Sequence, residues 1–451
     1  MSSTGTYVGR PAIAPALTTR TPGNALVAVA ILGLFMLAAI VSAVRKDITQ
    51  GFDEVAHVSY AAAIQHDGDT APALQTMRLL DPRTFEFTAT ANYLNHPSTY
   101  YALLAILGPT LEGHPRALLA HRLIDVAIVT LGFAALLGLG LAARFSREQF
   151  YAYAVPLGCI PVLAPLAGAV NNDDLAFCGG AIVMLGVWQL IASPRSSLPG
   201  SPGRERSGLW LALALVGVIA AGWAKLTGLL LTAAMVSAVF AYLLWRKQLP
   251  VIWIVAAALA FALAATPYVE FILRYGSPTP ETPAQIALLK DGARAAGWAD
   301  LPRQSFAAYF SYFIGEFVAD WMPTLGARSD LNYAALVIPV ETLGCAFVGI
   351  ALSVRRLWRR RESALDVIVV AGALAIGATF TVHAIYSYGR YAATGWLMDA
   401  YPRYYLPLIA IVPLACLSLA AAIDAPRWRN ALLAFLVAGP VIFRIFGAPL
   451  G

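Results

Sequence analysis

The chain has 451 residues, of which 59% are hydrophobic and only 12% are charged, roughly half the charged fraction of an average soluble protein. Apolar runs of about 18 residues or more recur along its whole length. These features exclude a soluble globular protein. They predict an all-α polytopic membrane protein, with a cytoplasmic tail over residues 1–23 and one transmembrane domain over residues 24–451.

The positive charge of the chain does not indicate nucleic acid as a partner. The net charge is +6, but the basic residues flank the apolar runs, as residues that set membrane topology do. All four cysteines fall within predicted spans, so the sequence predicts neither a disulfide framework nor a metal site built on cysteine.

About eleven spans are predicted, within a range of ten to thirteen. The first apolar run is longer than the hydrophobic region of a signal peptide, about 7–15 residues, and is interpreted as a retained span. The stretch 208–245 is too long for one span, so two shorter helices with a bend at Lys225 are expected. The predicted spans are 24–44, 119–143, 150–169, 175–193, 209–223, 227–245, 250–270, 334–353, 364–384, 404–422 and 430–447.

Basic residues occur in every short connection on one side of the predicted spans. Arg144, Arg147 and the run Arg359-Arg360-Arg361 are examples. By the positive-inside rule this side is cytoplasmic. The two long loops, about 45–118 and 271–333, are then extracytoplasmic, and the first is expected to carry juxtamembrane helices.

Two adjacent carboxylates, Asp53 and Glu54, open the first outer loop and are the candidate catalytic residues. In a helix they point about 100° apart, so they cannot both face one substrate atom. Asp53 and His57 are spaced i and i+4, which would let the imidazole hold the carboxylate. The alternative is a solvated first helical turn, where the helix dipole favours acidic residues.

Two polar segments further along are candidate substrate-binding sites. His96-Pro97 begins an apolar segment that contains Tyr100, although proline at a first helical turn is also a routine start signal. Asn172 and Asp173 belong to a polar turn between two spans. Such a turn suits a hydroxylated or cationic ligand, and helix capping explains it equally well.

Three cationic positions complete the candidate binding residues. Lys225 lies within apolar sequence, where an ammonium indicates a functional site by default, unless it snorkels to the membrane interface. Arg390 and Arg403 lie on the outer side, and Tyr404 follows the second. Arginine is a bidentate phosphate ligand and tyrosine stacks on sugar or prenyl groups; the alternative is an interfacial anchor within an aromatic belt.

Together these segments resemble the C-type integral-membrane glycosyltransferases, which use polyprenyl-phosphate sugars and include protein O-mannosyltransferases and the aminoarabinose transferase of lipid A. Two departures from the family pattern are Ser98, where a second proline is usual, and Ala224, where threonine is commoner. The matching motifs, in chain order, are Phe52-Asp53-Glu54-Val55-Ala56-His57, His96-Pro97-Ser98-Thr99-Tyr100-Tyr101, Asn172-Asp173-Asp174, Ala224-Lys225-Leu226-Thr227 and Pro402-Arg403-Tyr404.

The resemblance implies transfer of a sugar from a polyprenyl-phosphate donor to an extracytoplasmic acceptor, with inversion. Asp53 would be the base, and Lys225 and Arg403 would stabilise the departing phosphate. The acceptor stays open among a lipid, a glycan and a protein. The expected location is the bacterial cytoplasmic (inner) membrane, among its lipids, with the N-terminus inside and the active site on the periplasmic face. Some relatives bind a divalent cation near the carboxylates, but no metal-ligand spacing stands out here.

The main alternative is a multi-pass transporter, or a lipid or glycolipid flippase without transferase activity. Transporters often contain repeats with broken helices at matching positions in their two halves. The sequence has one candidate break, at Lys225, without a matching partner. Long outer loops rich in carboxylates and aromatic residues also favour an enzyme. A third interpretation is a non-catalytic assembly subunit that keeps the fold.

Overall fold

The computed structural model describes residues 22–192, 202–319, 337–397 and 400–446 of the chain. Within these residues, nine helices are long and apolar enough to cross a membrane. A tenth span results if η3 (Pro402–Leu408) and α15 (Ile411–Ala420), which meet at a bend of 64°, are counted as one. The nine helices are α1 (Pro22–Arg45), α4 (Ala117–Ala142), α7 (Asp173–Ala192), α8 (Pro202–Ala224), α9 (Leu226–Trp245), α10 (Val251–Tyr275), α13 (Val337–Trp358), α14 (Ala364–Thr394) and α16 (Pro426–Phe446).

The predicted all-α polytopic fold is therefore confirmed; among the described residues the number of spans is one below the expected range, or at its lower limit if the bent pair is counted. The difference lies in the range 150–169, which was expected to be one span. It forms two short helices, α5 (Arg147–Gly158) and α6 (Leu163–Ala167). Pro161 stands between them, and proline both lacks the backbone donor that a continuing helix needs and clashes with the preceding turn.

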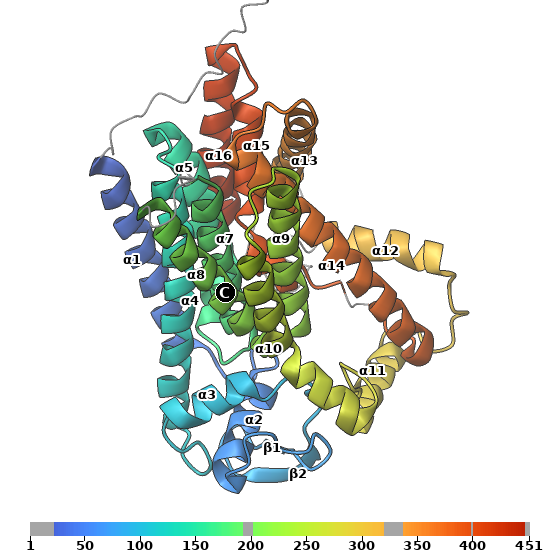
Figure 1. Cartoon of the computed structure of the whole chain (residues 1–451). Coiled ribbons are helices and arrows are strands. Elements are labelled where there is room, and N and C mark those ends of the chain that lie inside the picture. Colours follow the sequence, from blue (N-terminus) through green and yellow to red (C-terminus); the bar gives the residue numbers. More distant parts are fainter. Residues whose placement is uncertain (1–21, 193–201, 320–336, 398–399, 447–451) are drawn as a thin grey trace, which may run out of the picture.

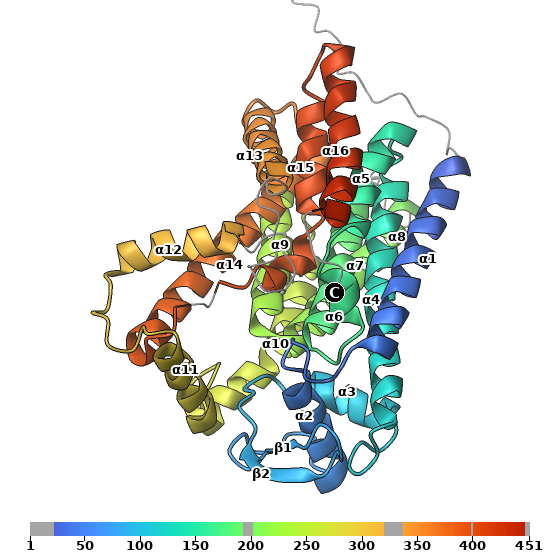
Figure 2. The same cartoon turned by 180° about the vertical axis from the view of Figure 1, so that it is seen from behind.

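The long helices run side by side as a bundle in Figures 1 and 2. Helix α7 is central to it and packs against both α4 and α8, while α9 packs against α14. Helix α14 leaves the bundle obliquely at its C-terminal end, beside α11 (Pro283–Ala295) and α12 (Phe306–Ala319) (Figure 1). It continues ten residues beyond the predicted end of that span, at residue 384, and so reaches the outer-loop elements.

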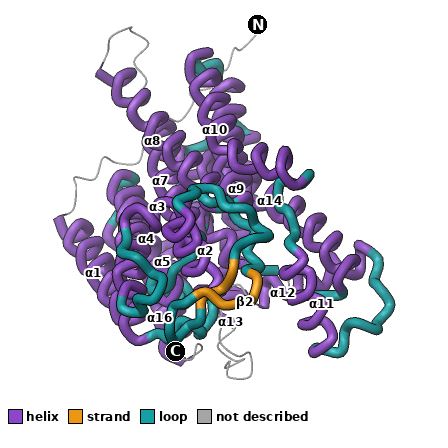
Figure 3. Tube along the Cα trace, turned by 90° about the horizontal axis from the view of Figure 1, so that it is seen from below, coloured by secondary structure: helices purple, strands orange, loops and turns teal. Residues whose placement is uncertain are grey.

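The first outer loop is an ordered layer at one end of the bundle. It contains α2 (Glu54–Asp67), α3 (Thr99–Leu107) and an antiparallel pair of strands, β1 (Arg78–Leu80) and β2 (Phe87–Ala91). Seen end-on in Figure 3, this layer lies across the bundle. Most of α2 is buried in a second hydrophobic cluster that includes Tyr60 and Tyr101. The expected juxtamembrane helices are present, and the two strands were not predicted.

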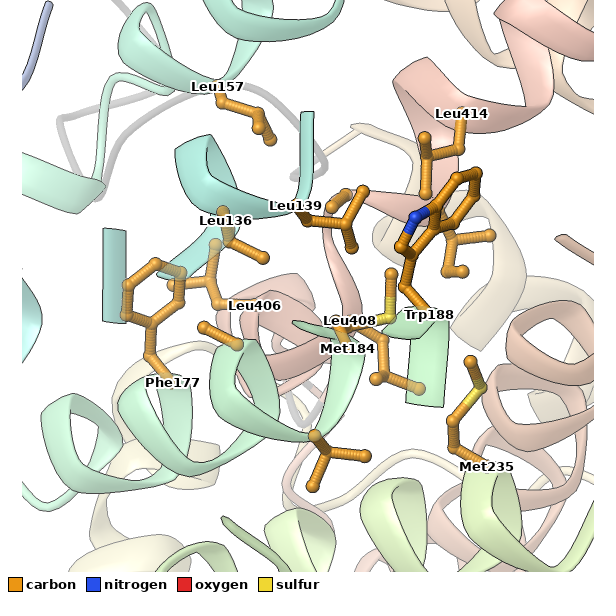
Figure 4. Packing of buried hydrophobic residues seen from close by; sticks show 14 of the residues in the cluster. Leu136, Leu139, Leu157, Phe177, Met184, Trp188, Met235, Leu406, Leu408 and Leu414 are labelled. Carbon is orange, nitrogen blue, oxygen red and sulfur yellow. The ribbon is translucent and has the colours of Figure 1, made fainter. Parts of the chain in front are cut away.

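The bundle has a continuous apolar core beneath this layer. One buried hydrophobic cluster, part of which Figure 4 shows, includes Phe177 and Met184 of α7, Leu136 of α4, Met235 of α9 and Leu406 of η3. Small residues allow close helix approach at this centre, as at the glycines of transmembrane helix interfaces. The core therefore fixes η3, and with it the side chains that η3 presents to the outer layer.

Candidate functional site

A cavity of about 560 Å³ lies where the first outer loop meets the α8–α9 junction, α11, α14 and η3. Segments far apart in the sequence build its walls, so only the folded chain brings them together. Of the residues predicted from sequence, the cavity is lined by Asp53, His96, Lys225, Arg390, Arg403 and Tyr404. The other predicted residues, Glu54, His57, Tyr100, Asn172 and Asp173, lie behind the wall.

The chain makes an unusual turn to present Asp53. Gly51, Phe52 and Asp53 all have positive φ, of 82°, 61° and 55°. For the two non-glycine residues this conformation is unfavourable, and such strain gathers at functional sites. The Asp53 side chain is 49% exposed; the Tyr93 hydroxyl donates to its Oδ1 at 3.0 Å, and the Arg403 Nη2 lies 3.9 Å from its Oδ2.

After the same turn, the buried side chain of Glu54 lies away from the cavity. Its carboxylate receives two hydrogen bonds from the Arg122 guanidinium, at 2.7 and 2.8 Å, and a third from the backbone N–H of Val170 at 3.0 Å. Arg122 also donates to the carbonyl oxygens of Ala43 and Lys46, at the end of α1. Glu54 therefore joins α1, α2 and α4, and the structure does not bring it to the cavity as a partner for Asp53.

His57 contacts Tyr101 and Asn171 rather than the Asp53 carboxylate. The Asn171 amide nitrogen lies 3.2 Å from His57 Nε2, while its oxygen accepts the N–H of Asp173. Nε2 is then the acceptor, and the proton on Nδ1 is donated to the Tyr101 hydroxyl at 2.8 Å. Burial lowers the pKa of His57 well below its usual value, and the charge of neighbouring cations lowers it further. The ring is neutral and holds the polar turn before α7 in place.

His96 stacks on His57, with ring centroids 5.9 Å apart, and forms part of the cavity wall. Burial first, and then the charge of Lys225, lowers the pKa of His96 to about 3. A neutral imidazole at this position offers a ligand hydrogen bonds without adding to the positive charge of the cavity.

Tyr100 and Asn172 are supporting residues. The Tyr100 hydroxyl is fully buried and lies 2.9 Å from both carboxylate oxygens of Asp125. The Asn172 amide donates to the carbonyl oxygen of Ala224 at 2.8 Å, which ties the start of α7 to the α8–α9 junction. Both side chains set the position of elements that reach the cavity.

Asp173 lies behind the cavity wall and between two cations. Lys225 Nζ is 2.8 Å from its Oδ1, and Arg403 Nε is 3.4 Å from its Oδ2. Lys225 Nζ also lies 3.3 Å from the centroid of the Tyr404 ring. The carboxylate offsets the cost of keeping two cations largely out of water, and it fixes both on the same side of the cavity.

Arg403 has unfilled hydrogen-bonding capacity. Its side chain is only 11% exposed, yet its guanidinium makes no hydrogen bond to any described residue; its contacts are the two ion pairs and nearby aromatic rings. Buried polar groups are nearly always hydrogen-bonded. A guanidinium held by charge at a cavity wall, with N–H donors to spare, is suited to an anionic ligand.

Arg390 reaches the cavity from α14, at another part of the wall. Its Nε donates to Glu281 Oε1 at 3.0 Å, and its Nη2 donates to the Tyr386 hydroxyl at 3.1 Å. Tyr93, Glu281 and Tyr386 were not predicted, because each is an ordinary loop or helix residue until the fold places it. In the sequence, Tyr93 and Tyr386 lie near the candidate residues His96 and Arg390, whereas nothing marks Glu281.

Among the residues that the structure describes, no evident ligand set exists for the divalent cation that some C-type enzymes bind. Within the described ranges, no three His, Cys, Asp or Glu side chains converge in the way that a metal site requires. Near Asp53 the close partners are Tyr93 and Arg403, and neither side chain is a metal ligand of the usual kind.

The fold matches those of two kinds of solved membrane protein. The archaeal oligosaccharyltransferase AglB from Archaeoglobus fulgidus, in complex with an inhibitory peptide and a dolichol-phosphate, superposes with a TM-score of 0.53 over 96% of this chain, at 14% identity. ArnT from Cupriavidus metallidurans superposes in its apo state with a TM-score of 0.50 over 92% of this chain, at 13% identity. This chain has the C-type glycosyltransferase fold.

The likeness is one of fold and not of close sequence. No protein-family profile and no curated protein matches the chain. The chain spans 57% of the length of AglB and 63% of that of ArnT. The resemblance to C-type glycosyltransferases predicted from five motifs is thus confirmed at the level of the fold, with these motifs gathered around or behind one cavity.

Proposed function

We propose that this protein is a membrane glycosyltransferase that moves a sugar from a polyprenyl-phosphate donor to an acceptor hydroxyl, with inversion at the anomeric carbon. The observation that carries this proposal is the pairing, in one cavity, of a carboxylate with a guanidinium that makes no hydrogen bond to any described residue. The C-type fold supports it, as does the dolichol-phosphate bound by the structurally similar AglB.

The leaving phosphate binds to Lys225 and Arg403. Both line the cavity, and Asp173 holds both from behind. The guanidinium matches two phosphate oxygens at once, and the ammonium adds a compact charge. As the bond between C1 and the phosphate oxygen breaks, negative charge grows on the phosphate, and these cations stabilise that charge most in the transition state.

Asp53 acts as the base on the other side of the transferred sugar. It accepts the proton of the acceptor hydroxyl as that oxygen forms its bond to C1, while the polyprenyl phosphate departs with the electrons of the broken bond. Tyr93 and Arg403 hold the carboxylate from two sides. Because attack and departure take place on opposite faces of C1, the configuration at this carbon inverts.

The proposed site faces the extracytoplasmic side of a bacterial inner membrane. The short basic connections between spans, such as 359–361, place their end of the bundle in the cytoplasm by the positive-inside rule. The first outer loop, which contributes to the wall of the cavity, lies at the opposite end of the bundle. A donor that arrives within the membrane and an acceptor that is a lipid, glycan or protein of the cell envelope both suit this position.

A complementation experiment tests the proposal. A strain that lacks the gene should accumulate a polyprenyl-phosphate sugar and lose that sugar from an envelope component. The wild-type gene should reverse both changes, and an Asp53→Asn variant expressed at the same level should reverse neither. If the lipid-linked sugar instead accumulates on the cytoplasmic leaflet only, the protein is a flippase and the transferase proposal is wrong.

A further inference from the structure

One face of α14 carries polar residues that the proposed reaction does not use. Thr379, His383 and Ser387 are spaced four residues apart, and this spacing places them on one face of a helix. They are 1%, 9% and 0% exposed, and all three line the cavity. Polar side chains at this depth are costly and commonly mark a substrate path.

Two of these side chains are not satisfied within the protein. The hydroxyl groups of Thr379 and Ser387 have no hydrogen-bond partner among the described residues. A serine or threonine in a helix usually donates to the carbonyl oxygen four residues earlier. On the exposed side of the same helix, Thr381 does so to Gly377 at 2.9 Å. The two buried hydroxyls are therefore free to turn toward a molecule in the cavity.

This face is adjacent to the residues assigned to the phosphate. The His383 ring centroid lies 5.6 Å from that of Tyr404, and the Tyr404 ring lies 3.3 Å from Lys225 Nζ. Thr227, two residues after Lys225, also lines the cavity, and its hydroxyl too has no partner within the described ranges. A group attached directly to a phosphate at Lys225 thus enters the cavity that these hydroxyls line.

The chemistry of this face suits a sugar better than a prenyl chain. A prenyl chain would leave the buried hydroxyls without partners, which is unfavourable. A prenyl chain would instead find apolar contacts in the same cavity, which is also lined by Leu226, Leu230 and Leu289. Sugar hydroxyls both donate and accept hydrogen bonds, as threonine and serine hydroxyls do.

We propose that the Thr379–His383–Ser387 face of α14 binds the hydroxyl groups of the transferred sugar and determines which sugar the protein accepts. This inference rests on the proposed function, because the sugar reaches this face through the phosphate held at Lys225 and Arg403. Sites that hydrogen-bond a substrate hydroxyl discriminate strongly against analogues that lack it, because their own buried groups are then left unpaired.

A binding experiment with defined lipids tests the inference without knowledge of the acceptor. The probes are a C20 prenyl phosphate alone and the same lipid carrying mannose, glucose, galactose or arabinose, and each dissociation constant is measured with the purified full chain in detergent. The wild type should bind at least one sugar-linked probe more tightly than the bare phosphate. Thr379→Val and Ser387→Ala should each weaken binding of that probe about two- to tenfold, and binding of the bare phosphate should stay unchanged.

Three further variants and a melting curve separate this role from a structural one. Thr381→Val, on the exposed side of the same helix, should leave both dissociation constants unchanged. Thr379→Ser keeps the hydroxyl and should keep most of the affinity, and Lys225→Met should weaken all probes, the bare phosphate included. Thr379→Val preserves side-chain shape and removes a hydroxyl without a described partner, so its melting temperature should equal or exceed that of the wild type.

The outcomes that contradict the inference differ from those that contradict the proposed function. If the Thr379 and Ser387 variants bind the sugar-linked probes like the wild type, or lose sugar-linked and bare phosphate equally, the face of α14 is not the sugar subsite. Equal binding of all probes by the wild type also overturns it. Failure of the wild type to bind even the bare prenyl phosphate contradicts the proposed function, and the inference with it.

Discussion

Arg403 combines two demands that usually exclude each other, because it is largely buried and yet its guanidinium makes no hydrogen bond to any described residue. The carboxylates of Asp53 and Asp173 keep the charge in place at 3.9 and 3.4 Å. Neither distance allows a hydrogen bond of ordinary length. The protein therefore positions the guanidinium without using its hydrogen-bond donors. These donors stay available to an incoming phosphate.

Two replacements of Arg403 should distinguish the effect of its positive charge on the transfer rate from the effect of its bidentate geometry. Arg403→Ala should slow transfer by about a hundredfold or more, the usual cost of one lost donor to developing charge. Arg403→Lys should recover only part of the rate, since the ammonium lacks the bidentate fork. Turnover of a polyprenyl-phosphate sugar in proteoliposomes measures both. Arg294→Ala, which removes an exposed arginine of α11, is the matched control, and a loss as large as that of Arg403→Ala would contradict the assignment.

Glu54 illustrates how adjacent residues acquire opposite roles. The sequence made both carboxylates catalytic candidates, pointing in different directions; in the structure Glu54 is 1% exposed, and its carboxylate accepts hydrogen bonds from Arg122 and Val170. Arg122 is 68 residues from Glu54 in the sequence, and no local sequence pattern relates the two residues. Asp53 stays at the cavity because three successive residues with positive φ, ending with Asp53 itself, turn the chain just before Glu54.

Glu54→Gln should destabilise the fold rather than remove the chemistry. It leaves the Arg122 charge buried without its counter-ion, and the loss of one partner of a buried ion pair typically costs about 3–5 kcal/mol. Thermal unfolding in detergent should show a clear fall in melting temperature, whereas turnover per folded molecule should change far less than in Asp53→Asn. Glu112→Gln, in the exposed pair with His66, should leave the melting temperature nearly unchanged, because exposed ion pairs contribute little to stability. An unaltered melting temperature of Glu54→Gln would contradict the structural role.

At the scale of elements, α7 connects the core to the site. Its Gly180 touches η3 so closely that a Cβ atom added there would overlap Pro407. Glycine is required at this position for that approach and not for backbone conformation. Since η3 carries Arg403 and Tyr404, the contact sets where the cation and its neighbouring ring stand relative to Lys225 at the α8–α9 junction.

Gly180→Ala should therefore impair activity through η3. Overpacking of this kind costs about 1–3 kcal/mol, and a displacement of about 1 Å in a catalytic group can reduce the rate by roughly a hundredfold. We expect slower transfer and weaker binding of prenyl phosphate, measured with the purified variant. Gly344→Ala on α13, where an added Cβ meets nothing within 4 Å, should leave both unchanged. Wild-type binding and turnover in Gly180→Ala would show that η3 is not held by this contact.

The sequence predicted elements better than it predicted their ends and contacts. Apolar length located the spanning helices, because hydrocarbon thickness sets a minimum run. It missed the break between α5 and α6, where Pro161 interrupts an otherwise apolar run, and it ended α14 at residue 384 because polar residues follow. Those same residues, including Ser387 and Arg390, proved to be on a continuing helix at the cavity. Motif order drew attention to Asp53, Lys225 and Arg403, which line the cavity, but nothing local marked Thr379, which lines it too.

On the scale of the whole molecule, the ordered outer layer and the basic connections lie at opposite ends of one bundle (Figures 1 and 2). This polarity follows from chain geometry, since spans joined by short connections alternate in direction. An enzyme that uses a membrane-borne donor needs two different ends of this kind, because donor and acceptor then meet on one side of the membrane only.

Labelling of single cysteines with an impermeant reagent should reveal this polarity. The four native cysteines are first replaced by serine or alanine. Asp69→Cys and Asp291→Cys, both in outer segments, should then react in intact cells, and Gln248→Cys and Arg359→Cys, in the short basic connections, should react only after the cells are opened. Reaction of the second pair in intact cells would invert the proposed orientation.

The central claim is that Asp53 removes the acceptor proton while a polyprenyl phosphate leaves. It is tested most directly by incubating a radiolabelled polyprenyl-phosphate sugar with membranes from the deletion strain, which supply the acceptor, and with either wild-type or Asp53→Asn protein. The wild type should move the label from the donor lipid to an envelope component and release unlabelled polyprenyl phosphate. The Asp53→Asn protein should bind the donor with unchanged affinity and move no label. Equal transfer by the two proteins, or no transfer by the wild type from any polyprenyl-phosphate sugar, would contradict the account.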